Sequence, residues 1–193
     1  MIKLIVGLGN PGREYEKTRH NAGFLFLDHV LEKYSGCWTN ESKFHGIVAN
    51  TFIDGNKVIL LKPQTFMNRS GLSVGSVVRF YKFDVEEVLI AHDELDFEAG
   101  KVKLKKGGGH AGHNGLRDII AALGNKDFCR IRSGIGRSKA GKSVSDYVLS
   151  GPGKEEKALI LSAFNSIELQ LDKIVKGDIA VAMNNLNLGT RRE

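Results

Sequence analysis

The sequence is poor in cysteine, with only Cys37 and Cys129 among its 193 residues. Two isolated cysteines make neither the paired spacing of a zinc site nor a disulfide framework, which favours a reducing, cytoplasmic compartment. No window is long and apolar enough to span a bilayer, and we find no signal-peptide pattern at the start of the chain. The sequence therefore predicts a cytoplasmic protein that makes no use of a membrane.

Internal repeats and interdomain linkers are absent as well. A chain of 193 residues with 41% apolar and 26% charged residues has an ordinary composition and is long enough to bury a substantial core. We therefore expect residues 1–193 to form a single domain.

The net charge of +6 is unevenly distributed along the chain. Residues 101–142 contain eleven lysines and arginines against two aspartates, a local balance of +9, so the remainder sums to −3. This concentrated basic region indicates a polyanionic partner, nucleic acid above all, although a solvated face that only aids solubility would give the same count. One basic region needs no second subunit, so we expect a monomer.

Apolar periodicity predicts strands that alternate with helices, which is typical of the α/β class. The expected strands are residues 3–6, 46–53, 57–62, 88–91, 101–105 and 128–132, and the expected helices are residues 24–34, 70–81, 116–123, 154–176 and 179–186. A hairpin turn at residues 54–56 makes the sheet mixed. The strand at residues 101–105 turns Val102 and Leu104 inward and its lysines outward, which is typical of an edge strand.

A polar segment of about a dozen residues joins the first strand to the first helix, whereas a plain connection needs only ~2–6 residues. Open α/β sheets place their sites at the carboxyl ends of buried strands. Asn10 and His20, which both lie in this segment, are therefore the first candidates for a functional site.

Three familiar motifs occur only in part. Gly7-x-Gly9-x-x-Gly12 follows a strand as a dinucleotide fingerprint does, but the helix starts only near Phe24, and Asp28 lies inside that helix rather than after a second strand. The glycines at residues 107–109 are not closed by the Lys-Ser/Thr of a phosphate-binding Walker loop. No His-Glu-x-x-His zinc motif is present, so we expect neither a nucleotide cofactor nor a metal.

Gly71-Leu72-Ser73-Val74-Gly75 matches the nucleophile elbow of serine hydrolases, and Asp93 and His113 follow it in the order of a catalytic triad. The elbow requires a strand that leads directly into the serine, whereas the preceding segment does not have a strand pattern. A serine esterase using Ser73 remains an alternative function.

One set of residues describes hydrolysis by water: His20, Asp93, Asn10, Asn68 and Asn114. A neutral histidine can take a proton from water, and a carboxylate at a strand end can fix its tautomer and stabilise the imidazolium. Asparagine amides can bind a peptide and a developing oxyanion. Taken singly, each residue has a structural explanation as well, since aspartates cap turns and asparagines cap helices.

Four segments of the chain resemble the signature segments of the bacterial-type peptidyl-tRNA hydrolases, in that family's order and near its spacing. These are residues 7–23, Phe66-Met67-Asn68, His92-Asp93-Glu94-Leu95-Asp96 and residues 107–115. The resemblance implies a single-domain three-layer α/β/α sandwich around a twisted mixed β-sheet, with helices at about 154–187 packing near the cleft. It implies an enzyme that hydrolyses the ester between the peptide and the 3′ ribose of tRNA.

The resemblance also assigns roles to individual residues. His20 is the implied catalytic base, Asp93 orients it, and Asn10 holds the attacking water or the reacting carbonyl. The implied contacts to the peptidyl end of the substrate are Tyr15, Phe66, Met67, Asn68, His113 and Asn114. The implied contacts to the tRNA phosphate are Lys103, Lys105 and Arg132. Lys106 and the basic loop at residues 134–142, which we expect to be mobile, match the family less well. A non-catalytic RNA-binding domain is the second alternative.

Overall fold

The computed structural model describes residues 1–138 and 143–189. Seven strands form one mixed sheet in the order β2-β3-β4-β1-β5-β7-β6. They are β1 (Leu4–Gly7), β2 (Thr39–Glu41), β3 (Gly46–Ile53), β4 (Asn56–Pro63), β5 (Val88–Glu94), β6 (Val102–Lys106) and β7 (Cys129–Gly134). Strands β4, β1, β5 and β7 are parallel to one another, whereas β3 and β6 pair antiparallel to their neighbours.

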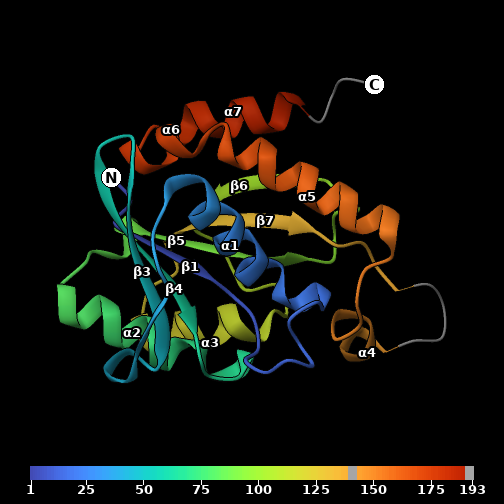
Figure 1. Ribbon diagram of the computed structural model, residues 1–193, viewed down its shortest axis with the longest axis horizontal. Coiled ribbons are helices and arrows are strands. Elements are labelled where there is room, and N and C mark those ends of the chain that lie inside the picture. The colour runs from blue at the N-terminus through green and yellow to red at the C-terminus, as the bar shows by residue number, and fades with distance from the viewer. Residues whose placement is uncertain (139–142, 190–193) are drawn as a thin grey trace.

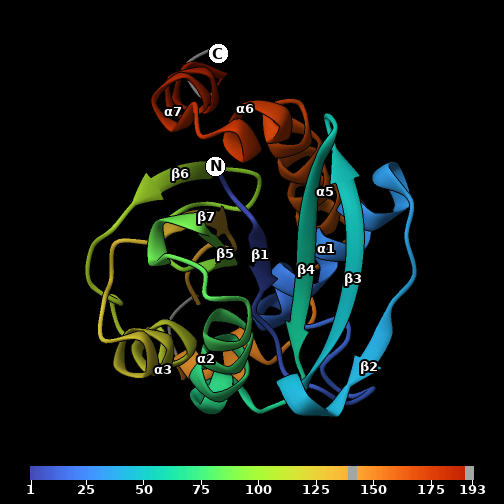
Figure 2. The same cartoon turned by 90° about the vertical axis from the view of Figure 1, so that its left-hand side faces the viewer.

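Helices cover both faces of the sheet, as Figures 1 and 2 show. They are α1 (Ala22–Tyr34), α2 (Ser70–Tyr81), α3 (Asn114–Leu123), α4 (Val144–Val148), α5 (Lys154–Glu168), α6 (Leu171–Lys176) and α7 (Ile179–Gly189). One apolar core joins the sheet to α1, α5, α6 and α7, and a second core joins the other face to α2 and α3. The expected three-layer α/β/α arrangement is therefore confirmed. No helix in residues 1–138 and 143–189 combines the length and apolar character that crossing a membrane requires.

All six strands expected from the sequence are present, and their ends differ from the expected ends by at most three residues. Strand β6 is an edge strand, as predicted, and its side chains Val102 and Leu104 are buried in the apolar core. Helix α3 ends at Gly124, whose φ of 63° is the left-handed conformation that glycine adopts at low cost. The sequence pattern did not reveal β2 or the five-residue α4. Part of the basic loop, residues 139–142, lies outside the described residues.

The long helix predicted for residues 154–176 is wrong, because the chain breaks after Glu168 into α5 and α6. Leu169 at the break is 72% exposed, whereas Leu171 just after it is fully buried. The bend lets both helices pack their apolar faces on the same curved sheet. A straight helix would carry one of those faces away from the core.

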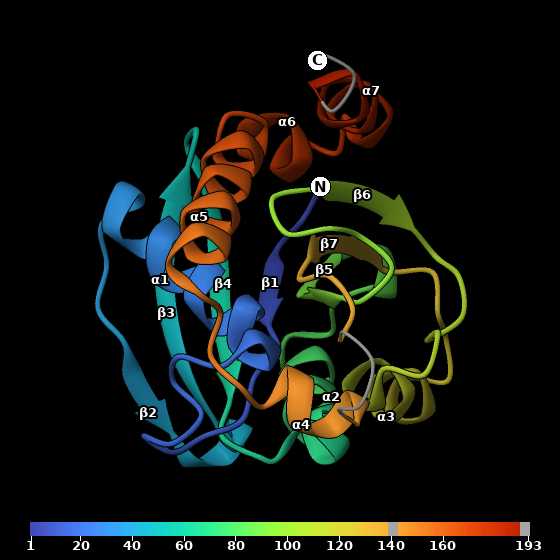
Figure 3. The same ribbon diagram turned by 90° about the vertical axis from the view of Figure 1, so that its right-hand side faces the viewer.

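The C-terminal helices also differ from the expected position near the cleft. Val175, at the end of α6, accepts a hydrogen bond from the backbone N–H of Ile2, so α6 lies at the amino end of β1. Only the start of α5 comes near the opposite edge, on the side to which the arrow of β7 points in Figure 1, and Figure 3 is the view onto that edge. Helix α6 therefore lies at the far end of the sheet, α7 packs against the edge strand β6, and neither covers the carboxyl edge of the parallel strands.

Close packing brings α1 onto the sheet at that open edge. A Cβ on Gly7 would lie 2.2 Å from the carbonyl oxygen of Gly23, and a Cβ on Gly23 would lie 2.3 Å from the carbonyl oxygen of Ala91. Any larger side chain at either position would push the helix away from β1 and β5. The short 3₁₀ helix η1 (Arg19–Asn21), which carries His20, is held directly above the strand ends as a result.

Candidate active site

A cleft of about 850 Å³ opens at the carboxyl ends of β1, β4, β5 and β7. Its lining includes ten residues that the sequence predicted for the site: Asn10, His20, Phe66, Met67, Asn68, Asp93, Lys105, His113, Asn114 and Arg132. Two predicted residues lie outside the lining. Tyr15 packs edge-on against Phe66 with 6.4 Å between ring centroids, and the Lys103 ammonium lies over the ring of Phe97.

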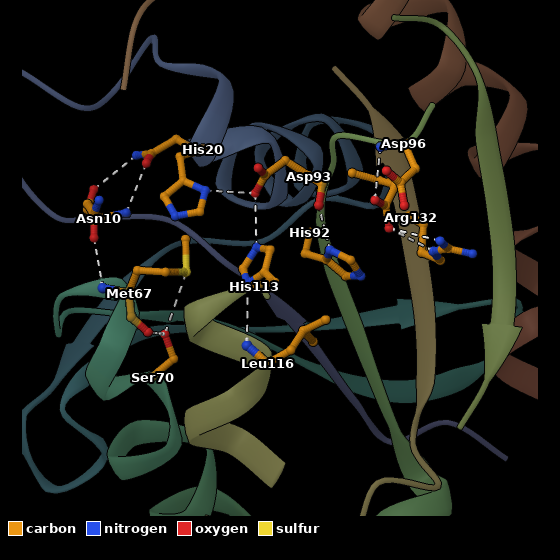
Figure 4. A network of polar contacts seen from close by, with 12 residues as sticks. Asn10, His20, Met67, Ser70, His92, Asp93, Asp96, His113, Leu116 and Arg132 are labelled. Atoms are coloured by element: carbon orange, nitrogen blue, oxygen red, sulfur yellow. Dashed lines mark hydrogen bonds and ion pairs between the residues drawn. The ribbon is translucent and has the colours of Figure 1, made fainter. Parts of the chain in front are cut away.

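His20 and Asp93 form a hydrogen-bonded pair at the centre of this cleft (Figure 4). The distance between His20 Nδ1 and Asp93 Oδ1 is 2.9 Å, and Asp93 is only 4% exposed at the end of β5. An ionised carboxylate only accepts hydrogen bonds, so Nδ1 of His20 carries the proton. Its Nε2 is then an unprotonated nitrogen, which is the form that can accept a proton from water.

His113 binds the same carboxylate oxygen from the other side. Its Nε2 lies 3.0 Å from Asp93 Oδ1, while its Nδ1 accepts a hydrogen bond from the backbone N–H of Leu116 at 3.3 Å. His113 thereby caps the start of α3 and donates its Nε2 proton to Asp93. The sequence left open whether His113 lines the cleft or supports Asn114, and the structure places it in the cleft lining.

The charges of this group follow from its burial and its contacts. Burial alone would raise the pKa of Asp93. The charges and hydrogen bonds of the two neighbouring histidines lower it by more, so the pKa lies well below the usual value of 3.8. Burial lowers the pKa of His20, whereas the charge of Asp93 and its hydrogen bond raise it, with a net pKa above 6.5. Asp93 is therefore ionised at neutral pH, and His20 is a stronger base than a free histidine.

Asn10 is fixed by three hydrogen bonds. The side chain of Asn21 accepts from the backbone N–H of Asn10 and donates to its carbonyl oxygen, both at 2.9 Å. The backbone N–H of Met67 donates to Asn10 Oδ1 at 2.7 Å. Since Oδ1 is occupied, the Nδ2 donor is the group that Asn10 can offer to a ligand. The sequence did not identify Asn21, although it directly follows His20.

Asn68 and Asn114 are both exposed in the lining, on two elements that pack against each other. Asn68 belongs to the 3₁₀ helix η3 (Met67–Arg69) that follows β4, and Asn114 is the first residue of α3. Within the described residues, neither amide side chain forms a hydrogen bond. His113 rather than Asn114 caps α3, so both amides are available to a ligand.

The basic side of the cleft is partly neutralised. Nε and Nη2 of Arg132 contact Glu94 Oε2 at 3.0 and 2.9 Å, and the guanidinium stacks 4.5 Å from the ring centroid of Phe97. Two of its three nitrogens are thus already engaged by a carboxylate. Lys105 lies nearby and is exposed in the lining, so it is the less hindered cation for a phosphate.

Arg130 is a further residue that the sequence did not single out. It is 3% exposed on β7, and its Nη1 donates to the carbonyl oxygen of Gly109 at 2.7 Å while Nη2 donates to that of Gly108. The guanidinium therefore fixes the position of the glycine-rich loop through its backbone carbonyl groups. Its place two positions before Arg132, on the same face of the strand, was the available signal, since alternate residues of a strand share a face.

The histidine cluster could be taken for a metal site, because ligand atoms of His20, Asp93 and His113 all lie within 4.8 Å of one another. Both ring nitrogens that face Asp93 carry protons in this hydrogen-bond pattern. A cation would require both rings to change tautomer and would leave the N–H of Leu116 without its acceptor. His92 is no better a ligand, since its Nδ1 donates to the backbone oxygen of Asp93 and it is 3% exposed. We therefore assign these groups to hydrogen bonding.

The serine esterase alternative fails on geometry. Ser73 is fully buried within α2, and its Oγ donates to the backbone oxygen of Phe44 at 2.7 Å. The serine lies outside the lining of the cleft that holds His20 and Asp93. The dinucleotide interpretation fails too, because α1 begins at Ala22 rather than at the glycines and Asp28 lies inside it.

A buried histidine–aspartate pair that opens into a cleft beside amide donors defines a hydrolytic enzyme with an α/β sandwich fold. The family model for peptidyl-tRNA hydrolase matches residues 4–193. The chain belongs to the peptidyl-tRNA hydrolase family.

Individual relatives agree over nearly the whole length. The peptidyl-tRNA hydrolase of Dichelobacter nodosus is 50% identical over 92% of this chain and 95% of its own, and that of Methylococcus capsulatus is 47% identical over 97% and 100%. The crystal structure of the Acinetobacter baumannii peptidyl-tRNA hydrolase has a TM-score of 0.93 and 47% identity, and covers 96% of this chain and 94% of that one.

Proposed function

We propose that this protein hydrolyses the ester bond between the peptide and the 3′ ribose of tRNA, releasing free tRNA and peptide, with water activated by His20. The observation that carries the proposal is the hydrogen bond between His20 Nδ1 and the buried, ionised Asp93, which leaves Nε2 as a base in the cleft. Membership of the peptidyl-tRNA hydrolase family supports the choice of substrate. Hydrolysis by a water nucleophile requires no serine.

The reaction then proceeds in two steps. His20 Nε2 takes a proton from a water molecule while the oxygen of that water attacks the ester carbonyl. Asp93 stabilises the imidazolium that forms on His20. Asn10 Nδ2 donates to the carbonyl oxygen, which becomes negatively charged in the tetrahedral intermediate. The intermediate collapses, the bond to the ribose oxygen breaks, and that oxygen takes the proton back from His20.

The remaining residues of the cleft bind the substrate in this proposal. The amides of Asn68 and Asn114 pair with the peptide backbone, while Tyr15, Phe66, Met67 and His113 line the space around the acyl group. Lys103, Lys105 and Arg132 contact phosphates of the tRNA. In this proposal the protein acts as a monomer in the cytoplasm and uses neither a metal nor a cofactor.

The experiment that tests this function compares tRNA charged with an N-acylated amino acid and with the same amino acid unblocked. The amides can pair with a neutral acylated nitrogen, whereas none of them can neutralise an ammonium group. We expect the acylated substrate to be cleaved faster on the order of 10–100-fold in kcat/KM, the value of one or two hydrogen bonds of about 1.4 kcal/mol each. Equal rates for the two substrates would contradict the assignment of the asparagines.

A further expected result concerns the basic side of the cleft. Replacing Lys105 by alanine should raise KM for whole tRNA roughly three- to tenfold at low salt, because an exposed phosphate contact is lost. The log–log salt dependence of binding should flatten by roughly 0.7–0.9 units, and turnover at saturation should be unchanged. Lys57→Ala is the matched control, since Lys57 is exposed at the other end of the sheet.

The structure makes Lys105 a sharper test than Arg132. Removing Arg132 would leave the nearly buried carboxylate of Glu94 without its ion-pair partner, which affects stability as well as binding. An N-acyl-aminoacyl-adenosine, which lacks the rest of the tRNA, should not respond to Lys105→Ala. An equal loss with this small substrate would instead place Lys105 among the groups that act on the ester.

A further inference from the structure

Arg19 directly precedes the proposed base, yet it takes no part in the mechanism derived above. Its side chain is 9% exposed, and a guanidinium is always charged in proteins. A buried guanidinium is tolerated only where hydrogen bonds and an opposite charge compensate its lost hydration. The partners that compensate Arg19 therefore indicate what this residue holds in place.

Those partners all belong to one distant segment, which runs from α4 to the start of α5. Arg19 Nη1 donates to Ser150 Oγ at 2.7 Å, to the carbonyl oxygen of Gly151 at 3.0 Å and to that of Ser150 at 3.2 Å. Nη2 contacts Glu156 Oε2 at 2.5 Å. The guanidinium stacks 4.3 Å from the ring centroid of Tyr147, and the backbone N–H of Arg19 donates to the Ser150 carbonyl oxygen at 3.1 Å.

The same segment also lines the cleft. Val144, Ser145, Val148 and Leu149 all belong to the lining, and Val144 is 60% exposed there. A helix of five residues is too short to be stable by itself, so its position depends on contacts with other elements. Arg19 supplies contacts to Tyr147 in α4 and to the residues just after it, and Tyr147 adds a hydrogen bond from its hydroxyl to the carbonyl oxygen of Ile135 at 2.7 Å.

We propose that Arg19 is a positioning residue: it fixes α4 as one side of the substrate cleft at a set distance from His20. The inference rests on the proposed function, because it concerns how that same cleft binds its substrate. The backbone and the guanidinium of Arg19 both take part. Together they connect η1, which carries the base His20, to the segment around α4, which borders the substrate cleft. A substrate bound between them meets both surfaces in the correct spacing.

The contacts of Arg19 indicate which kinetic constant it controls. Its side chain binds residues 147–156, whereas His20 is held by Asp93 on β5. Loss of the guanidinium contacts therefore displaces α4 and leaves the histidine–aspartate pair in place. KM should rise, while kcat and the pH midpoint of kcat should remain near their wild-type values.

The test is the Arg19→Lys variant, which keeps the charge near Glu156 but loses the planar group that binds Ser150 and Gly151 and stacks on Tyr147. Displacement of α4 weakens substrate contacts on one side of the cleft, so we expect KM to rise about tenfold, which corresponds to about 1.4 kcal/mol of lost binding. The rise should be the same for whole peptidyl-tRNA and for N-acyl-aminoacyl-adenosine, because both enter this part of the cleft. Arg79→Lys, the same change at an exposed site on α2, is the matched control.

A second variant approaches the contact from the other side. Tyr147→Leu removes the ring on which Arg19 stacks and should also raise KM with little change in kcat, so the inference stays testable if Arg19→Lys does not fold. A lower kcat with a shifted pH midpoint and unchanged KM would overturn the inference, since Arg19 would then act on His20. A lower melting temperature with unchanged KM and kcat would overturn it as well.

Wild-type hydrolysis is measured first in each series. If the wild-type chain does not cleave the acylated substrates, the proposed function itself is wrong. If the wild-type chain cleaves them and both variants keep the wild-type KM, only the role of Arg19 is wrong.

Discussion

Replacing His20 by alanine should lower the turnover of N-acylated aminoacyl-tRNA by 10²–10⁴-fold, the usual contribution of a positioned general base. The substitution removes the nitrogen that accepts the proton from water, whereas the amides and cations that we propose bind the substrate stay in place. KM should therefore change much less than kcat. The measurement is single-turnover deacylation at saturating enzyme, with tRNA binding followed separately.

Ser73→Ala is the control that separates the two hydrolytic mechanisms. Ser73 donates one buried hydrogen bond from α2 to the backbone oxygen of Phe44, so its loss should cost about 1 kcal/mol of folding stability and leave turnover unchanged. An inactive Ser73→Ala variant together with an active His20→Ala variant would contradict the water mechanism.

Much of the architecture could be predicted from the sequence because the signals are local. The alternation of Val102 and Leu104 with lysines identifies an edge strand, and the glycine at position 124 marks the end of a helix. The rule that polar residues at the carboxyl ends of parallel strands form one site brought Asn10 and Asp93 together correctly. These patterns depend only on neighbouring residues and on the general geometry of parallel sheets.

The residues that hold the site in place were not predictable in the same way. Arg19 and Ser150 lie 131 positions apart, and Arg130 reaches loop carbonyls more than twenty positions before it in the chain. Pairs so distant leave no periodic signal in a single sequence. The break between α5 and α6 was missed for a related reason, since it follows from the shape of the core rather than from a helix-stopping residue.

The sequence alone also does not show which oxygen of Asp93 the histidines contact. From the sequence alone, an asparagine at this position would offer His20 the wrong hydrogen-bonding group. In the structure, both histidines contact the same oxygen, Oδ1. An asparagine can place its own Oδ1 there and accept both hydrogen bonds, so the two histidines would keep their tautomers while the negative charge is lost.

Asp93→Asn should consequently isolate the effect of the charge. We expect turnover to fall on the order of 10²–10³-fold, the size of a single electrostatic contribution to a transition state, because the imidazolium of His20 is no longer stabilised. Asp93 raises the pKa of His20, so its neutralisation should lower that pKa. The reaction requires neutral His20, and the rate should therefore reach its plateau at a lower pH than in the wild-type enzyme.

Asp93→Ala completes the comparison because it removes both hydrogen bonds as well as the charge. His20 is then free to change tautomer, and turnover should fall further than in Asp93→Asn. Asp96→Asn, the same chemical change at an exposed aspartate in the cleft lining, should leave both turnover and the pH midpoint unaltered. If Asp93→Asn behaves like this control, the carboxylate only orients His20 and its charge has no part in hydrolysis.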